Sequence, residues 1–266
     1  MPSIRVATTT RLYDAAGSGL AVIAVHGSLS NGRQWRSLAE RLQDRFRVLS
    51  LDLYLTQGGG GPQVGDFRFE DDVAFVEALL AEHAPAHLVG HSYGGVVAAR
   101  AAFNQRDKLA SVTLIEPSCF HLLGKSGAHF EEIMALRHDG LAFAEKGDAA
   151  GQARHFIEYW MGPQAWITMP ERRQAAILAS LKRLEPDWQG TMGPHTSLDE
   201  YRGLDVPALM LRARDTRRPS AHIVDLIGAA LPKAQIAEVA FGGHMSPITN
   251  PDAVNAEIER FLLAPR

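Results

Sequence analysis

The chain of 266 residues has little cysteine and no long apolar run. Cys119 is the only cysteine, which excludes an internal disulfide and a metal site built from several cysteines. No apolar run approaches the about 20 residues that a membrane-spanning helix needs, and residues 1–6 lack the apolar segment of a secretory signal. We expect a cytoplasmic protein with no membrane partner, in which the Cys119 thiol serves packing.

The sequence also lacks a basic stripe and a phosphate-binding loop. Its 27 Lys and Arg residues are scattered and are outnumbered by 30 Asp and Glu, which argues against a nucleic-acid partner. Four consecutive glycines, Gly58–Gly61, are followed by neither Lys-Ser nor Lys-Thr, so a flexible loop is expected there. A nucleotide-binding protein would need phosphate-dependent stabilisation, which we expect to be absent. No metal and no organic cofactor is expected.

Short apolar runs, which are typical of strands buried on both faces of a sheet, recur along the chain. They alternate with stretches of helical spacing at residues 35–42, 69–83 and 251–263. This alternation predicts an α/β fold, with a parallel sheet covered by helices on both faces. The predicted strands cover residues 4–6, 12–13, 20–25, 46–51, 88–89, 109–115, 206–211 and 236–239.

The pattern changes between residues 118 and 202, where strand-like runs disappear. Helices are predicted there at residues 130–137, 141–146, 149–161 and 170–184. We interpret 118–202 as a helical cap inserted into a core made of 1–117 and 203–266. Seven large apolar residues suggest that the cap roofs an apolar pocket, and whether His121 and His195 also face it is left open. The seven are Met134, Trp160, Met161, Trp166, Met169, Trp188 and Met192.

A short motif stands between one predicted strand and a helix. Gly90–Gly94 has the form G-x-S-x-G, in which Ser92 occupies a sharp turn and the flanking glycines avoid collisions where strand and helix approach. A serine hydroxyl is a weak nucleophile unless a positioned base accepts its proton. His244, in a glycine-rich loop directly after the last predicted strand, is the candidate base, because sites form at such strand ends.

Together these features resemble the α/β-hydrolase family over almost the whole chain. The resemblance rests on His26-Gly27 after a strand, then Trp35, the motif at Gly90–Gly95, and Gly243-His244 before a final helix. It implies a mostly parallel sheet of eight strands, with Ser92 at the nucleophile turn and a helical cap after the sixth strand. The interruption at 118–202 agrees with that placement.

Two backbone amides are candidates for the oxyanion hole, the donor pair that stabilises the developing negative charge. One is the N–H of Tyr93, the residue after the candidate nucleophile. The other is the N–H of Ser28, in the loop after His26-Gly27. The alternative for this loop is a plain turn that ends a strand.

The acid that would orient His244 departs from the usual family pattern, Gly-x-x-Asp after the seventh strand. Here Thr216 stands at the position of the aspartate, and Asp215 lies one residue earlier, among several arginines with which it could form surface ion pairs. Some family members carry the acid at the end of the sixth strand, where this chain has Glu116. Glu116 is favoured over Asp215, since an unpaired carboxylate directly after a buried strand is costly; its alternative role is to anchor the start of the cap.

The sequence therefore predicts a serine hydrolase that cleaves an ester or related acyl bond of a small apolar molecule through an acyl-enzyme. A carbon–carbon bond hydrolase or lyase using the same serine and histidine is one alternative. A non-catalytic small-ligand receptor on the same fold is another, since fold does not determine function. A serine at this turn, where haloalkane dehalogenases and epoxide hydrolases carry aspartate, argues against those two classes. A homo-oligomer is left open.

Overall fold

A computed structural model describes residues 2–7, 9–53, 68–193 and 195–265 of the chain. Eight strands form one sheet in the order β1-β2-β4-β3-β5-β6-β7-β8. β1 and β2 pair antiparallel with their neighbours, and every pairing from β4 through β8 is parallel. The strands are β1 (Ser3–Val6), β2 (Thr9–Ala16), β3 (Leu20–Val25), β4 (Phe46–Leu51), β5 (Ala86–His91), β6 (Leu109–Ile115), β7 (Ala208–Ala213) and β8 (Ala234–Val239). The predicted eight-stranded, mostly parallel sheet is confirmed.

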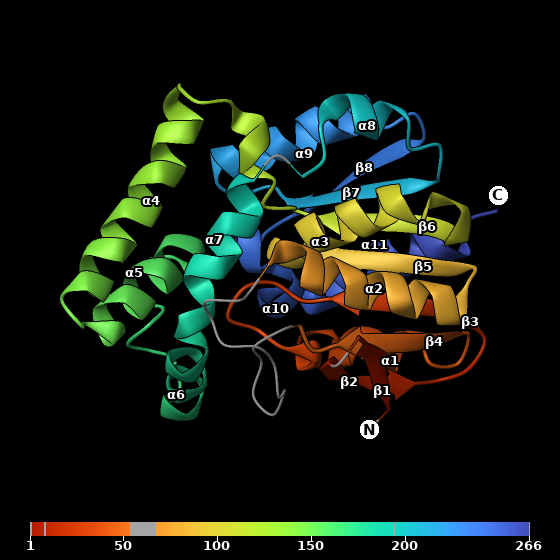
Figure 1. Cartoon of the computed structure of the whole chain (residues 1–266), viewed down its shortest axis with the longest axis horizontal. Helices are drawn as coiled ribbons and strands as arrows, with labels where there is room; N and C mark the ends of the chain where they lie inside the picture. Colours follow the sequence, from red (N-terminus) through yellow and green to blue (C-terminus); the bar gives the residue numbers. More distant parts are fainter. Residues whose placement is uncertain (1, 8, 54–67, 194, 266) are drawn as a thin grey trace.

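Helices cover both faces of the sheet, as predicted (Figure 1). Alternate residues of each central strand face opposite ways, so Ile23 packs in the cluster formed with α2, α3 and α9, whereas Val22 packs in the cluster formed with α1 and α11. Both residues are fully buried, which explains the continuous apolar runs. These helices are α1 (Arg36–Leu42), α2 (Phe69–His83), α3 (Tyr93–Asn104), α9 (Arg218–Ala230) and α11 (Pro251–Leu263).

Five helices lie between β6 and β7, the stretch where the sequence predicted the cap. They are α4 (Ala128–Glu145), α5 (Ala149–Met161), α6 (Glu171–Ser180), α7 (Leu184–Met192) and α8 (Leu198–Arg202). Figure 1 shows α4, α5 and α6 standing beyond one end of the sheet, with α7 between them and α3. In the same view α8 lies away from them, beside α9.

Three predictions about these elements were wrong in detail. Residues 130–137 and 141–146 belong to one helix, α4, which continues through the buried Gly140. The predicted helix 170–184 ends at Ser180, and α7 begins after a 3-10 turn at Leu181–Arg183. Helices α7, α8 and α9 were not predicted.

The seventh strand is displaced by two residues from its predicted position at 206–211. Pro207 cannot donate to a sheet, and β7 begins at Ala208 directly after it and continues to Ala213. The candidate acid Asp215 and its neighbour Thr216 therefore follow the end of the strand more closely than the sequence suggested.

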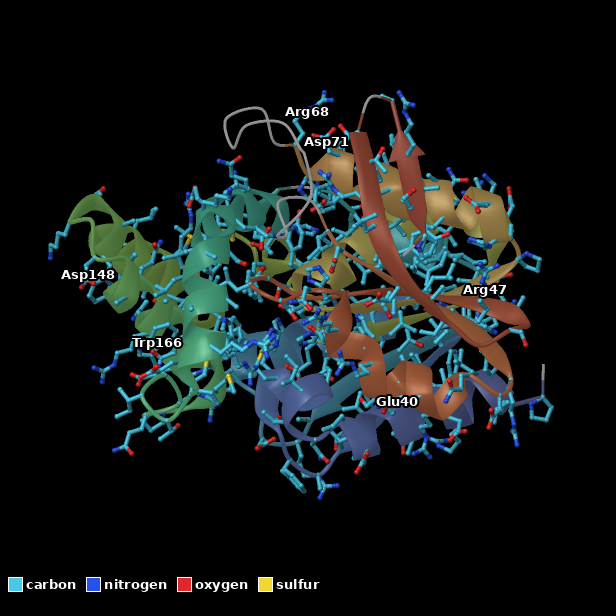
Figure 2. All side chains as sticks on the ribbon, turned by 90° about the horizontal axis from the view of Figure 1, so that it is seen from below. Glu40, Arg47, Arg68, Asp71, Asp148 and Trp166 are labelled. Atoms are coloured by element: carbon cyan, nitrogen blue, oxygen red, sulfur yellow. The ribbon has the colours of Figure 1, made fainter. Side chains whose placement is uncertain are left out.

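Charged side chains are spread over separate elements. Figure 2 shows Glu40, Arg47 and Asp148 at distant points of the surface, on α1, β4 and the start of α5. Among the described residues, no helix is long and apolar enough to span a membrane. The predicted loop at Gly58–Gly61 lies outside the described residues.

Candidate active site

Ser92 stands on a strained turn between β5 and α3. Its φ of 57° lies in the left-handed region that non-glycine residues rarely adopt. A Cβ on Gly90 would come within 2.5 Å of the Gly94 carbonyl oxygen, and a Cβ on Gly94 within 2.3 Å of the His26 carbonyl oxygen. The two glycines therefore allow the strand, the helix and the end of β3 to approach as closely as they do, for the reason the sequence suggested.

Three side chains from three strand ends meet at this turn. The Ser92 Oγ lies 2.9 Å from Nε2 of His244, and Nδ1 of His244 lies 3.0 Å from Oε2 of Glu116. His244 comes from the 3-10 turn Gly243–Met245 after β8, and Glu116 directly follows β6. All three side chains are buried. With Nδ1–H donating to the carboxylate, Nε2 is free to accept the serine proton, which is the arrangement that activates a serine.

Glu116 is held by more than the histidine. Its Oε1 accepts the backbone N–H of Ala213 at 2.9 Å, and its Oε2 accepts the hydroxyl of Thr216 at 2.6 Å. The backbone at Glu116 has a φ of 41°, which lies in the left-handed region and is costly for a non-glycine residue. Three hydrogen bonds therefore hold this fully buried carboxylate in one orientation toward His244.

The structure places Asp215 elsewhere. Its carboxylate accepts the backbone N–H groups of Gly242 and Gly243, at 3.2 and 2.9 Å, and it makes no contact with the His244 ring among the described hydrogen bonds. None of the described ion pairs joins Asp215 to a neighbouring arginine, and Arg212 and Arg214 pair with Glu238 instead. Asp215 thus binds the loop that carries His244.

The two candidate oxyanion donors flank Ser92. Tyr93 opens α3, and the first N–H groups of a helix have no partner within it. Ser28 lines the same two pockets as Ser92, and Asp187 of α7 lines the smaller of the two with it. The loop after β3 therefore contacts both the core and the helices between β6 and β7.

Two buried histidines stay neutral and organise the loops around the site. Burial lowers the pKa of both His26 and His91 to about 3. His26 donates from Nδ1 to the Gly27 carbonyl and accepts the Leu53 N–H on Nε2, which joins the ends of β3 and β4. These roles have no signal in the sequence, because they depend on which ring nitrogen contacts which backbone group.

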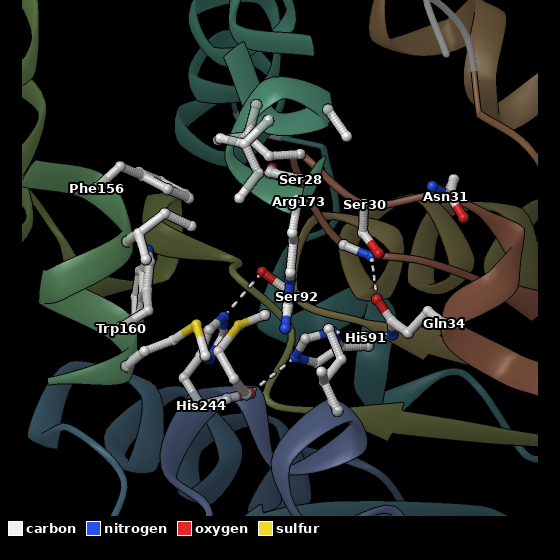
Figure 3. A pocket seen from close by; sticks show the side chains of 18 residues that line it. Ser28, Ser30, Asn31, Gln34, His91, Ser92, Phe156, Trp160, Arg173 and His244 are labelled. Carbon is white, nitrogen blue, oxygen red and sulfur yellow. Dashed lines mark hydrogen bonds between the residues drawn. The ribbon is translucent and has the colours of Figure 1, made fainter. Parts of the chain in front are cut away.

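His91, the second residue of the motif, links the two loops of the site. Its Nε2–H donates to the backbone carbonyl of His244 at 2.8 Å, and its Nδ1 accepts from the Gln34 amide at 3.1 Å. The Gln34 carbonyl oxygen in turn accepts the Gly27 N–H at 3.4 Å. Figure 3 shows this chain of hydrogen bonds running from the loop after β3 to the backbone of His244. The sequence analysis missed Gln34.

A pocket of about 130 Å³ opens above Ser92 and His244, and α5 and α6 form its roof (Figure 3). The Trp160 indole covers His244, with the two ring centroids 4.0 Å apart. Of the seven cap residues named from the sequence, Trp160 and Met161 line this pocket and Trp188 lines a smaller one beside it. The other four line neither pocket.

His121 and His195, left open by the sequence, do not line these two pockets. His195 stacks on Phe69 with ring centroids 3.8 Å apart, and His121 donates to the Thr196 carbonyl at 2.9 Å. Among the described residues, no group of three His, Cys, Asp or Glu side chains is arranged to hold a metal ion.

A buried ionic cluster lies beneath the smaller pocket. The Arg183 guanidinium lies 2.8 Å from Oδ2 of Asp72 on α2 and 2.9 Å from Oδ1 of Asp187 on α7. The Tyr93 hydroxyl also donates to Asp72 at 3.0 Å. Burial raises the pKa of Asp187 to about 6, although Arg183 opposes this shift. The cluster ties the helices between β6 and β7 to the core at the residue that follows Ser92.

Comparison with known proteins agrees with this fold. The model of the alpha/beta hydrolase family matches residues 22–257, most of the chain. The chain therefore belongs to the α/β-hydrolase family, and it is a hydrolase. It is 30% identical over 218 residues to the pimeloyl-[acyl-carrier protein] methyl ester esterase of Vibrio cholerae, a match that covers 78% of this chain and 80% of that protein.

Solved structures show the same fold. The enol-lactonase from Burkholderia xenovorans LB400 superposes with a TM-score of 0.81 at 18% identity, over 99% of this chain and all of that one. A thermophilic esterase from Thermogutta terrifontis superposes with a TM-score of 0.77 at 23% identity, over 98% of both chains. At these identities the likeness is one of fold.

Proposed function

We propose that this hydrolase is a serine esterase, in which Ser92 attacks an ester carbonyl and forms an acyl-enzyme. The observation that carries the proposal is the pair of hydrogen bonds joining Ser92 to His244 and His244 to Glu116, at 2.9 and 3.0 Å. The hydrogen bonds connect a weak nucleophile to a base and the base to an orienting carboxylate. This arrangement activates a serine for acyl transfer.

The steps follow from these positions. His244 Nε2 takes the hydroxyl proton as the Ser92 Oγ bonds to the carbonyl carbon, and Glu116 stabilises the imidazolium that results. The N–H groups of Ser28 and Tyr93 would hold the oxyanion, each contributing about 2.7 to 4 kcal/mol to the barrier reduction. His244 then passes its proton to the leaving alkoxide, and a water molecule activated by the same histidine hydrolyses the acyl-enzyme.

Relatives named for ester chemistry support this reaction type. The Vibrio cholerae relative is named a methyl ester esterase, and the fold neighbours include an enol-lactonase and an esterase. We further propose that residues 118–202 act as the cap that selects a small molecule, because α5 and α6 roof the pocket above Ser92. The single cysteine, which is buried, fits a cytoplasmic location.

Labelling with a fluorophosphonate tests the proposal, because the probe reacts only with an activated serine. Wild type should be labelled, Ser92→Ala should not, and Ser118→Ala is the matched control, since the Ser118 hydroxyl lies 3.1 Å from that of Ser92. Absence of labelling, together with binding of a small apolar ligand, would favour the receptor. Labelling that persists in Ser92→Ala contradicts the assignment of the nucleophile.

Panels of substrates distinguish the esterase from a carbon–carbon bond hydrolase. Esters of graded acyl length and a vinylogous diketone should be compared in wild type and Ser92→Ala. We expect Ser92-dependent turnover of esters. Turnover of the diketone alone would replace the esterase by a carbon–carbon bond hydrolase using the same three side chains.

A further inference from the structure

One cation enters the pocket above Ser92 without an anionic partner. Arg173, in the first turn of α6, lines this pocket together with Ser92 and His244. Figure 3 shows its side chain extending from α6 into the pocket. Among the described hydrogen bonds and ion pairs, none involves the Arg173 guanidinium, and the pocket lining contains neither Asp nor Glu. From this we propose that Arg173 binds a carboxylate of the substrate, so that the substrate is an ester carrying an acid group; this rests on the esterase proposed above.

The other arginines on this side of the molecule differ from Arg173. Arg183 pairs with Asp72 and Asp187, Arg137 lies 2.5 Å from Glu185, and Arg217 lies 3.4 Å from Glu132. Each of those cations joins two elements of the protein. Arg173 instead points its charge at the space where a substrate must lie, and a guanidinium is the side chain best suited to a two-pronged bond with a carboxylate.

The described part of the pocket lining contains no other Arg or Lys, and no carboxylate that would compete for Arg173. His91, which lines the same pocket, is neutral because its pKa is lowered to about 3 by burial. Other walls of the pocket are apolar. They are formed by Phe156, Ile157, Trp160, Ala176, Ile177 and Met245.

The smaller pocket on the other side of Ser92 has the opposite character. Its described lining contains Phe120, Trp188 and Asp187, and neither Lys nor Arg. Ser92 and Ser28 line both pockets, so an ester bound at Ser92 reaches into each. Its acid-bearing arm is therefore directed to the Arg173 side and its apolar arm to the Phe120 side.

Matched pairs of esters test the inference. Each pair carries either a carboxylate or the neutral primary amide of the same shape. The acyl-arm series is the monomethyl esters of malonate, succinate, glutarate and adipate, and the alcohol-arm pair is O-butyryl glycolate and its amide. For at least one pair, wild type should prefer the acid about tenfold in kcat/KM, a modest figure because Arg173 is exposed at the pocket mouth.

Variants of α6 identify the residue responsible. Arg173→Gln should remove the preference by lowering kcat/KM for the acid and leaving the amide unchanged, and Arg173→Lys should restore part of it. The matched control is Arg172→Gln, an exposed neighbour that removes the same charge but does not line the pocket. Equal rates for acid and amide in every pair, or equal losses for both in Arg173→Gln, would overturn the inference.

A binding measurement keeps the inference independent of turnover. Calorimetric titration with succinate and glutarate should show binding to wild type and to Arg172→Gln, and about tenfold weaker binding to Arg173→Gln. If no ester is turned over but this difference is present, the esterase proposal fails and the anion site stands. If esters are hydrolysed through Ser92 but both dicarboxylates bind the three proteins alike, the anion site fails and the esterase stands.

Discussion

The hydroxyl of Thr216 donates a hydrogen bond of 2.6 Å to the Glu116 carboxylate. Thr216 occupies the position at which the usual pattern after the seventh strand places aspartate. In this chain the carboxylate is that of Glu116, at the end of β6, and the Thr216 hydroxyl binds it by a hydrogen bond. An aspartate at 216 would instead bring a second negative charge against Glu116, which is unfavourable at this depth.

Replacing Thr216 by Val should lower kcat/KM by about tenfold to a hundredfold, because a hydrogen bond to a charged group contributes about 1.5–3 kcal/mol. The carboxylate loses a donor it cannot replace and becomes less well oriented toward His244. Thr216→Ser keeps the hydroxyl and is the matched control. The measurement is steady-state hydrolysis of p-nitrophenyl butyrate, and an unchanged rate in Thr216→Val would show that Glu116 does not depend on this contact.

Glu116→Gln should reduce kcat by about four orders of magnitude, as loss of the orienting carboxylate does in serine proteases. Asp215→Asn removes the same charge one residue from Thr216, but Asp215 accepts from two backbone amides and does not touch the His244 ring. We expect its kcat to fall by about tenfold at most, through a looser loop.

The same p-nitrophenyl ester and burst kinetics can be used for both variants. Circular dichroism establishes that each has folded. If Asp215→Asn alone abolishes turnover, the acid has been assigned to the wrong residue.

Gln34→Leu should lower both kcat and the rate of fluorophosphonate labelling by about tenfold. The variant removes the acceptor of the Gly27 N–H and the donor to His91, so the loop that carries Ser28 loses its link to the backbone of His244. Gln43→Leu is the control, because that side chain donates only to the Glu40 carbonyl at the surface. Labelling at the wild-type rate would mean that the link does not position the loop.

Acid should destabilise the fold well before the bulk of the carboxylates titrate. His26 and His91 are neutral in the folded state with pKa values near 3, and both bind a proton in the unfolded chain below about pH 6.5. Each therefore lowers the free energy of unfolding by about 1.4 kcal/mol per pH unit between these values. Asp187 acts oppositely between its ordinary pKa and about 6, since the folded state binds that proton more tightly.

Urea unfolding between pH 7 and 4 measures this dependence. As the pH is lowered from 6 to 4, the three groups together should reduce the free energy of unfolding by about 1.4 kcal/mol per pH unit. In Asp187→Asn this slope should rise to about 2.7 kcal/mol per pH unit. The variant also loses stability at every pH because Arg183 loses a partner, so the slope is the informative quantity. Equal slopes in the two proteins would contradict a raised pKa of Asp187.

The thiol of Cys119 should not react with iodoacetamide in the native protein at pH 8. It is fully buried, and burial raises its pKa to about 12, so almost no thiolate is present. Its Sγ lies 3.5 Å from the Tyr201 hydroxyl. Mass spectrometry should show alkylation in urea and none without it, whereas rapid native alkylation would require local opening around Tyr201.

The strands were the most predictable part of the fold. Val22 and Ile23 face two different helix layers, and both are buried. The continuous apolar run that predicted β3 therefore follows directly from the burial of both faces of the strand. The helices between β6 and β7 were harder to predict. The break predicted between residues 137 and 141 is absent, because α4 continues through the buried Gly140.

The sequence by itself determined which residue types stand at the strand ends. Ser92 and His244 could be named because glycines and buried strands surround them in a recognisable order. Glu116 bonds to His244, whereas Asp215 bonds to two glycine amides. Which carboxylate reaches the histidine depends on the direction of each side chain at its strand end, and one dihedral angle can reverse that direction. Likewise Arg172 and Arg173 are equivalent in the sequence. Only the packing of α6 over the pocket turns the second of them toward Ser92, because the direction of a side chain on a helix changes by about 100° per residue.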